Sequence, residues 1–247
     1  MTCYWLEQTE ADVPAENDWL SDSEAFRLVG MRIPKRRADW RLGRWTAKQA
    51  IAVYLNLPTD AQALASIEIR PAASGAPEVF FENRSAALAI SLSHRAGRGL
   101  CTVALCGVEL GCDLELIELR SDSFIADYFT AEEQVLIARA DPADRSCLLA
   151  LLWSAKESTL KTLRTGLRVD TRCVTVMPAE TRKPVVPHLA YDPSGWRPLT
   201  THCSDGRIFC GWWQQSGVLV RTLVAVPRQP PPIQLHIPQA EQIEKVG

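Results

Sequence analysis

The sequence has little that would place it outside ordinary globular proteins. None of its eight cysteines forms a Cys-x-x-Cys pair, and several lie in apolar runs, so we interpret them as reduced core residues. No apolar run approaches the roughly 18 residues needed to span a bilayer, and no basic N-terminus precedes an apolar segment. A net charge of only −2 gives no general reason to expect nucleic acid or a membrane as partner. We therefore expect a soluble, cytoplasmic protein.

The chain is long enough to bury a real core. Its 247 residues, of which 47% are apolar and 23% charged, suffice for one large domain or two small ones. From Arg27 to Lys48, eight basic residues accompany a single acidic one, Asp39. Residues 39–55 have a helical apolar period, which predicts a helix with one apolar and one basic face. Such a face is either simply solvated or a surface for an anionic ligand or an acidic protein.

Apolar and polar residues alternate in several short segments, which predicts strands. The expected strands are 3–6, 67–70, 79–81, 88–94, 100–106, 108–115, 173–177, 208–213 and 218–226. Short turns join 88–94, 100–106 and 108–115, which predicts an antiparallel meander. Further helices are expected at 124–129, at 130–139 after a capping box, and from 141 to a stop at Gly166. From Pro227 on, we expect an extended proline-rich tail that does little for the core.

Three carboxylates form the candidate chemical centre. Asp113 and Glu115 are two apart on an expected strand, so their side chains point the same way, and Glu157 lies on a later helix. Three acids from two elements would suit Mg²⁺, which fills its remaining positions with water and phosphate oxygens. Simpler explanations remain open. The strand acids are also typical of a solvated face, and Glu157 could form a surface ion pair with Lys161. A lone His94 is more often structural than catalytic.

Several motifs occur in a distinctive order. They are Gly111-Cys112-Asp113-Leu114-Glu115, then Tyr128-Phe129-Thr130 with Glu133, then Trp153 with Lys156-Glu157 and Lys161. In this order and spacing they resemble the 4′-phosphopantetheinyl transferase superfamily, in its larger, Sfp-like type. Ser91 to His94, the Gly75-Ala76-Pro77 turn and Gly43-Arg44 extend the resemblance to residues from about 36 to 176.

The resemblance implies an α+β fold with two lobes related by a pseudo-twofold axis, each an antiparallel sheet with packed helices. The N-terminal half would be residues 1–108, the C-terminal half 109–226, and the tail 227–247. No internal sequence repeat indicates this independently. Coenzyme A would bind between the halves, and a chain of this length would be a monomer.

The implied activity is transfer of 4′-phosphopantetheine from coenzyme A to a serine of an acyl or peptidyl carrier protein, releasing adenosine 3′,5′-bisphosphate. By resemblance, Asp113, Glu115 and Glu157 hold Mg²⁺, with Mn²⁺ as an alternative, Glu157 is the base, and Lys161 stabilises the leaving pyrophosphate side. Coenzyme A would be contacted by Arg44, Arg70, Gly75, Ala76, Pro77, Ser93, His94, Asp113, Lys156 and Lys161.

Two positions depart from the family pattern. Ala76 stands where the family usually has lysine, so Arg70 or another side chain is expected to supply that phosphate contact. Ser91 replaces the usual asparagine, which we expect to alter a local hydrogen bond and not the reaction. Because carrier domains are acidic, the Arg36–Lys48 face and the Phe124–Tyr128 region are expected to meet the carrier.

Two alternatives belong to other classes. One is a non-catalytic module of the same fold that binds coenzyme A or a carrier protein; retention of the three acids and Lys161 argues against it. The other is unrelated phosphate-ester hydrolysis at a metal site, for which the sequence offers no second metal cluster and no histidine-rich motif.

Overall fold

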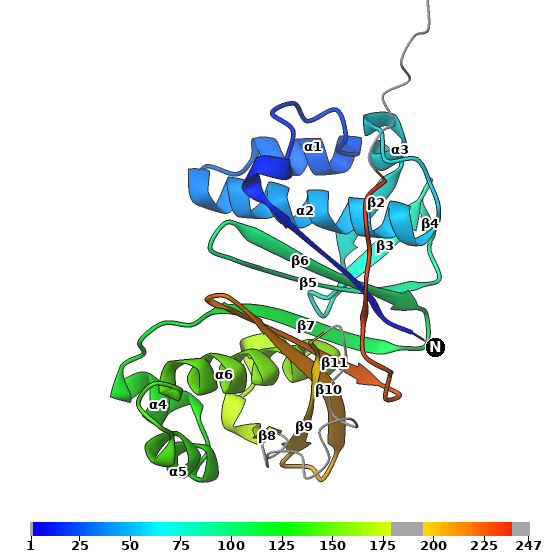
Figure 1. Cartoon of the computed structure of the whole chain (residues 1–247). Coiled ribbons are helices and arrows are strands. Elements are labelled where there is room, and N and C mark those ends of the chain that lie inside the picture. The colour runs from blue at the N-terminus through cyan, green and yellow to red at the C-terminus, as the bar shows by residue number, and fades with distance from the viewer. Residues whose placement is uncertain (1, 179–194, 239–247) are drawn as a thin grey trace, which may run out of the picture.

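The computed structural model describes residues 2–178 and 195–238 as a mixed α+β fold (Figure 1). The strands form a sheet ordered β12-β1-β6-β5, another ordered β7-β11-β10-β9-β8, and a small sheet ordered β2-β3-β4. No helix in the described part of the chain is both long and apolar enough to cross a membrane.

The element bounds follow the expected pattern in outline. The strands are β1 (Tyr4–Thr9), β2 (Ile67–Pro71), β3 (Pro77–Phe81), β4 (Arg84–Ser85), β5 (Leu88–Arg95), β6 (Arg98–Leu105), β7 (Glu109–Leu116), β8 (Val174–Pro178), β9 (Arg197–Cys203), β10 (Ile208–Ser216), β11 (Leu219–Val226) and β12 (Ile233–Gln234). The helices are α1 (Asp22–Val29), α2 (Pro34–Tyr54), α3 (Ala61–Ala65), α4 (Asp122–Tyr128), α5 (Ala131–Arg139) and α6 (Arg145–Thr162). The expected helix at 39–55 thus starts earlier, with Pro34 in its first turn.

Two long helices each cover one large sheet. In Figure 1, α2 lies over β1, β5 and β6, α6 lies against β7 and β11, and the strands β5 to β7 run through the middle of the molecule. One apolar core lies around α2 and the N-terminal strands, and a second lies around α6 and the C-terminal sheet. The strands β5 and β7 therefore lie between the two cores.

The meander prediction is wrong at its third strand. β5 and β6 form the expected antiparallel hairpin, but β7 pairs with β11 and joins the other sheet. β7 still runs beside β5, where hydroxyls replace backbone pairing: Ser91 Oγ accepts the amide N–H of Cys112 at 2.9 Å, and Ser93 Oγ accepts that of Leu114 at 3.2 Å. Side-chain acceptors on β5 thus satisfy β7 amides that a meander would have paired with backbone.

The N-terminal half contains a buried ion pair under a helix cap. Ser21 and Glu24 form a capping box at the start of α1, and Glu24 also accepts the backbone N–H of Ile69 at 3.1 Å. Lys48, on α2, reaches this carboxylate at 2.6 Å and is fully buried. The basic face expected over Arg36–Lys48 is corrected accordingly, because Lys48 belongs to the interior and cannot meet a partner protein.

The C-terminal half repeats the same set of contacts. Thr130 and Glu133 form the predicted capping box at the start of α5, and Glu133 accepts the N–H of Val176 at 2.8 Å. Lys156, on α6, lies 2.7 Å from Glu133 and is fully buried. The two halves are therefore built on one repeated unit, a capping glutamate that pairs with a lysine of the long helix and with the first strand after it.

The expectation for the tail is wrong within its described part. β12 pairs in parallel with β1, and the N–H of Leu235 bonds to the carbonyl of Trp5 at 2.7 Å. Leu235 and Ile237 pack against the N-terminal core. Residues 239–247 lie outside the described part of the chain. Proline-rich composition indicated an extended backbone correctly, but not the sheet edge that receives it.

Candidate active site

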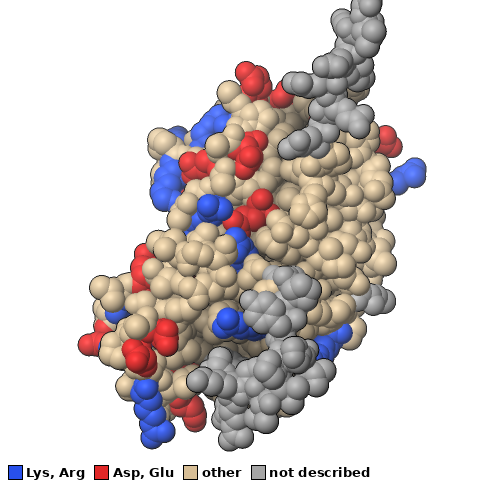
Figure 2. All heavy atoms as spheres, viewed as in Figure 1, with Lys and Arg blue, Asp and Glu red and all other residues tan. Residues whose placement is uncertain are grey.

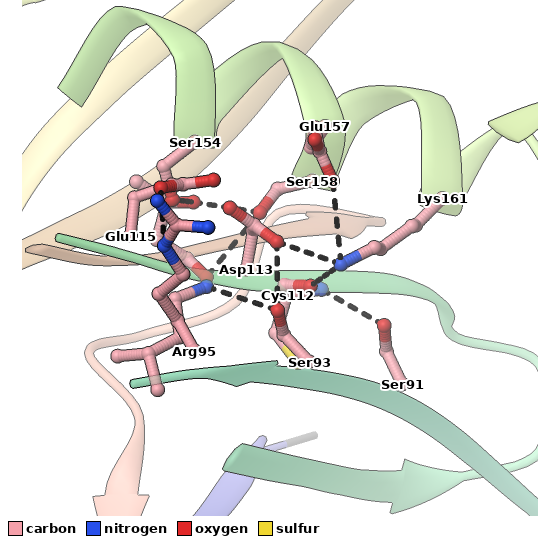
Figure 3. A network of polar contacts seen from close by, with 12 residues as sticks. Ser91, Ser93, Arg95, Cys112, Asp113, Glu115, Ser154, Glu157, Ser158 and Lys161 are labelled. Atoms are coloured by element: carbon pink, nitrogen blue, oxygen red, sulfur yellow. Dashed lines mark hydrogen bonds and ion pairs between the residues drawn. The ribbon is translucent and has the colours of Figure 1, made fainter. Parts of the chain in front are cut away.

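The predicted carboxylates meet where α6 crosses β7. Asp113 lies opposite Thr222 in the β7–β11 ladder, on the sheet face that α6 covers. Figure 3 shows Glu157 and Lys161 extending from α6 toward Asp113. Asp113 and Glu115 are both buried. The i, i+2 spacing on the strand and the i, i+4 spacing on the helix therefore bring four ionisable side chains together, as the sequence predicted.

Asp113 is the best-held member of this cluster. Its Oδ1 accepts hydrogen bonds from Lys161 Nζ and from Ser93 Oγ, each at 2.8 Å. Lys161 also donates to the carbonyl of Cys112 at 2.9 Å. The second oxygen, Oδ2, is buried and has no hydrogen-bond partner in the described residues. A buried carboxylate oxygen without a donor is costly unless a ligand or cation approaches it.

Glu157 carries the most perturbed carboxyl in the site. Burial raises its pKa to about 7, the Asp113 and Glu115 carboxylates act in the same direction, and Lys161 opposes them. For Lys161, burial alone would lower the pKa, but Asp113 and Glu157 outweigh it and raise the pKa. These mutual effects show that the carboxylates of the site lie close together and share the ammonium group of Lys161.

Glu115 is held by arginines. Its Oε2 lies 3.1 Å from the Arg120 guanidinium and 3.5 Å from that of Arg95. Burial raises the pKa of Glu115, Asp113 adds to the rise, and the two arginines oppose it. Glu115 is therefore a partly neutralised neighbour of the Asp113–Glu157 pair.

The cluster suits a hard divalent cation at two of its three acids. Within residues 2–178 and 195–238, no three His, Cys, Asp or Glu side chains form a preassembled metal site. Nevertheless, Asp113 offers a free buried oxygen, and Glu157 has the raised pKa that a nearby cation would reverse. Oxygen donors of this kind are those that Mg²⁺ prefers.

Close backbone contact between α6 and β7 sets this geometry. A Cβ built on Gly111 would lie 1.9 Å from the carbonyl oxygen of Ser158 and 2.6 Å from Thr162 Oγ1. We expect Gly111→Ala to push α6 away and cost about 1–3 kcal/mol of unfolding free energy. Urea unfolding measures this, with Gly43→Ala as the comparison, because a Cβ on Gly43 of α2 meets no atom within 4 Å. Unchanged stability of Gly111→Ala would contradict the packing.

The raised pKa of Glu157 predicts how stability depends on pH without divalent cations. Because its folded-state pKa of about 7 exceeds the ordinary 4.5, the contribution of this group is fully present below pH 4.5 and is lost as pH rises through 7. We expect Glu157→Gln to remove a loss on the order of 3 kcal/mol between pH 4.5 and 8. Chemical unfolding of both forms in a chelator, across that range, tests this; parallel curves would contradict it.

A basic cleft of about 640 Å³ leads to the cluster. Its wall includes Trp40 and Arg44 of α2, the turn Gly75-Ala76-Pro77, and Lys161. Arg44 lies over the Trp40 ring at 5.0 Å. The indole Nε1 of Trp40 is buried without a hydrogen-bond partner in the described residues, whereas the Nε of Arg44 lies 3.5 Å from Oε1 of Glu24. An unpaired indole donor on the wall favours an acceptor-rich ligand.

Two residues expected to contact coenzyme A lie elsewhere. Arg70 stacks on Phe80 at 4.4 Å and pairs with Glu68 at 2.5 Å, and it is not part of the cleft wall. Lys156 is buried against Glu133 and donates to backbone carbonyls, so it cannot reach the cleft. Both assignments are corrected: these cations are already neutralised by neighbouring carboxylates.

Ser93 and His94 lie beside the cluster and do not line the cleft. Ser93 orients Asp113 and pairs with β7, as described above. His94 is exposed at the end of β5, where desolvation lowers its pKa, Lys161 and Lys35 add to this, and Asp39 and Asp113 oppose it. The charges of Lys161 and Asp113 therefore influence the pKa of His94.

The sequence interpretation missed several residues of the cleft wall, among them Trp40, Arg164 and Arg168. Trp40 was one apolar residue among several on a helix. The two arginines follow α6, where their sequence has no recognisable motif. Only the fold brings this segment opposite the turn at Gly75.

The C-terminal half can be compared with known proteins. Residues 109–205 match the family model of the 4′-phosphopantetheinyl transferase superfamily, and this region contains Asp113, Glu115, Glu157 and Lys161. The match covers less than half of the chain, and it lies in the C-terminal half. No curated protein sequence matches the chain.

Three solved structures are similar to part of the chain. The holo-[acyl-carrier-protein] synthase of Helicobacter pylori, in complex with coenzyme A, is 18% identical, with 42% of this chain and 98% of that one covered and a TM-score of 0.34. The Bacillus anthracis synthase, in complex with coenzyme A (3′,5′-ADP), is 19% identical, with 42% of this chain and 94% of that one covered and a TM-score of 0.36. The Thermotoga maritima synthase is 20% identical, with 52% of this chain and 74% of that one covered and a TM-score of 0.34.

Proposed function

We propose that the protein transfers 4′-phosphopantetheine from coenzyme A to a serine of an acyl or peptidyl carrier protein, as the two-lobed type of the superfamily does. The observation that carries the proposal is the meeting of Asp113, Glu157 and Lys161 at the end of a basic cleft. This cluster lies in the region that matches the superfamily.

The cleft has the size and charge for a polyanionic ligand. Its volume of about 640 Å³ falls within the range of small-molecule sites. Its wall carries five cationic side chains and one acidic one, Glu78; the cations are Arg27, Arg44, Lys161, Arg164 and Arg168. Coenzyme A carries several phosphate groups and an adenine ring with hydrogen-bond acceptors, which Trp40 and Arg44 are placed to meet.

Asp113 and Glu157 would hold the divalent cation, with Glu115 beside them. Bound there, Mg²⁺ would neutralise charge on the pyrophosphate. We assign Oδ2 of Asp113 as the first metal ligand, because this oxygen accepts no hydrogen bond from the described residues. Hydrogen bonds to Asp113 and to the carbonyl of Cys112 hold the ammonium group of Lys161 beside this oxygen.

In the proposed reaction, the serine oxygen of the carrier forms a bond to the β-phosphorus while the bond from that phosphorus to the bridging oxygen breaks. Adenosine 3′,5′-bisphosphate leaves. Glu157 would take the serine proton, directly or through a water molecule. Lys161 stabilises the charge that develops on the leaving side.

The acceptor would approach an exposed surface at the junction of α1 and α2. Phe26, Val29 and Ile33 are exposed there, and Arg32 and Lys35 are exposed between or beside them. Figure 2 shows blue Lys and Arg atoms interspersed with red Asp and Glu atoms on this upper part of the molecule. A partner with an acidic surface and an apolar ridge would be complementary. The Phe124–Tyr128 region remains a second candidate, with Tyr128 exposed and Phe124 partly buried in an aromatic cluster.

The test is to incubate the purified protein with coenzyme A, Mg²⁺ and apo carrier proteins of fatty-acid, polyketide and nonribosomal-peptide systems. The expected result is a gain of one phosphopantetheine mass on at least one carrier, lost when a chelator is added. The absence of any gain would overturn the proposal. Tight binding of coenzyme A without a mass gain would instead support the non-catalytic binding module.

A further inference from the structure

Arg164 has a backbone conformation that arginine rarely adopts. α6 ends at Thr162, and Arg164 then takes a φ of 55°. Its N–H bonds to the carbonyl of Lys161 at 2.9 Å, and the N–H of Thr165 reaches that of Leu160 at 3.1 Å. This is the left-handed helix stop that glycine normally supplies, and a residue with a Cβ is strained there.

The helix stop itself does not require arginine. α2 ends with the same arrangement, in which Asn56 has a φ of 55° and the N–H of Leu57 bonds to the carbonyl of Ala52 at 2.8 Å. Asparagine tolerates this conformation better than other residues with a Cβ. Asn56 does not line the cleft, whereas Arg164 does. The feature that distinguishes the two stops is the guanidinium group in the cleft.

The charge of Arg164 is not neutralised by the protein. In residues 2–178 and 195–238, no hydrogen bond or ion pair engages its guanidinium. Its neighbour Arg168 donates to the carbonyls of Thr165 and Arg164, and across the cleft to that of Ser74. Arg168 thereby ties the segment after α6 to the turn that contains Ala76.

These contacts hold an unpaired cation on the cleft wall one helical turn beyond Lys161. The facing turn contributes Ala76, which has no charge to offer. A strained residue whose guanidinium has no partner in the described residues is typical of a ligand-binding position.

We propose that Arg164, positioned by Arg168, binds a phosphate group of the nucleotide in the cleft and so sets the affinity for coenzyme A. This inference rests on the proposed function. The phosphate is either in the diphosphate or at the ribose 3′ position, and both present the same chemistry to a guanidinium.

The test compares Arg164→Gly with Asn56→Gly, a matched change at the equivalent helix stop. Titration calorimetry with coenzyme A and with dephospho-coenzyme A measures affinity, and thermal unfolding measures stability. We expect both glycine variants to raise the melting temperature. Only Arg164→Gly should weaken coenzyme A binding, by about 10- to 100-fold, and Arg164→Lys should retain part of the affinity.

The two ligands distinguish the phosphates. A loss with coenzyme A alone supports contact with the 3′-phosphate, and an equal loss with both ligands supports contact with the diphosphate. Unchanged affinity of Arg164→Gly for both ligands would overturn the inference while leaving the proposed function intact. Failure of the unaltered protein to bind coenzyme A would overturn the proposed function itself.

Discussion

Asp113→Asn should lower phosphopantetheine transfer by about 10³-fold while the protein remains folded. The amide keeps an oxygen that can accept from Ser93 Oγ, so the contact between β5 and β7 is retained. It loses the negative charge that holds Lys161 and, in our proposal, the cation. Removing one of three neighbouring carboxylates also relieves repulsion on Glu157, which offsets the lost ion pair in the unfolding free energy.

Intact-mass kinetics at saturating coenzyme A would measure this loss, and thermal unfolding would verify the fold. Glu118→Gln is the matched control: Glu118 pairs with the same arginines, Arg95 and Arg120, but does not contact Asp113 or Lys161. We expect transfer by that variant to remain near the unaltered rate. Normal turnover by Asp113→Asn would refute the assignment of the site.

Lys156→Met should be among the most destabilising changes of a charged residue, costing about 3–5 kcal/mol of unfolding free energy. The substitution leaves Glu133 buried without its ammonium partner, although Glu133 still caps α5 and accepts the N–H of Val176. A buried carboxylate cannot be left unpaired at low cost. Lys48→Met should have a similar effect in the N-terminal half, because Glu24 loses the same kind of contact.

Urea unfolding of both variants would test this. Lys35→Met is the control, because Lys35 pairs with Asp39 at 2.8 Å but its side chain is 84% exposed, and such pairs contribute at most about 1 kcal/mol. A cost below 1 kcal/mol for Lys156→Met would show that the buried pair is dispensable. Retained coenzyme A binding in the folded fraction would agree with a structural role for Lys156.

Local signals in the sequence predicted much of the site. The capping box of Thr130 and Glu133, the spacing of Asp113 and Glu115 on a strand, and Glu157 with Lys161 on a helix are all present. Each depends on contacts within four residues, so composition and period suffice to predict them. Why Lys156 lies inside and Lys161 lies at the site was not readable, because both occupy the same helix and differ only in what packs against them.

Apolar period and turn residues in the sequence predicted most of the helices and strands, and the α+β fold and the chemical cluster followed from the resemblance of its ordered motifs to a known family. The tertiary structure alone decided that β7 leaves its predicted meander for β11, and that the tail adds β12 to the N-terminal sheet. It also decided that Arg164 lines the cleft in place of Arg70. The physical reason is the same in each case. The partner of a strand edge, or of a cation, comes from residues far apart in the chain, and these residues become neighbours only after folding.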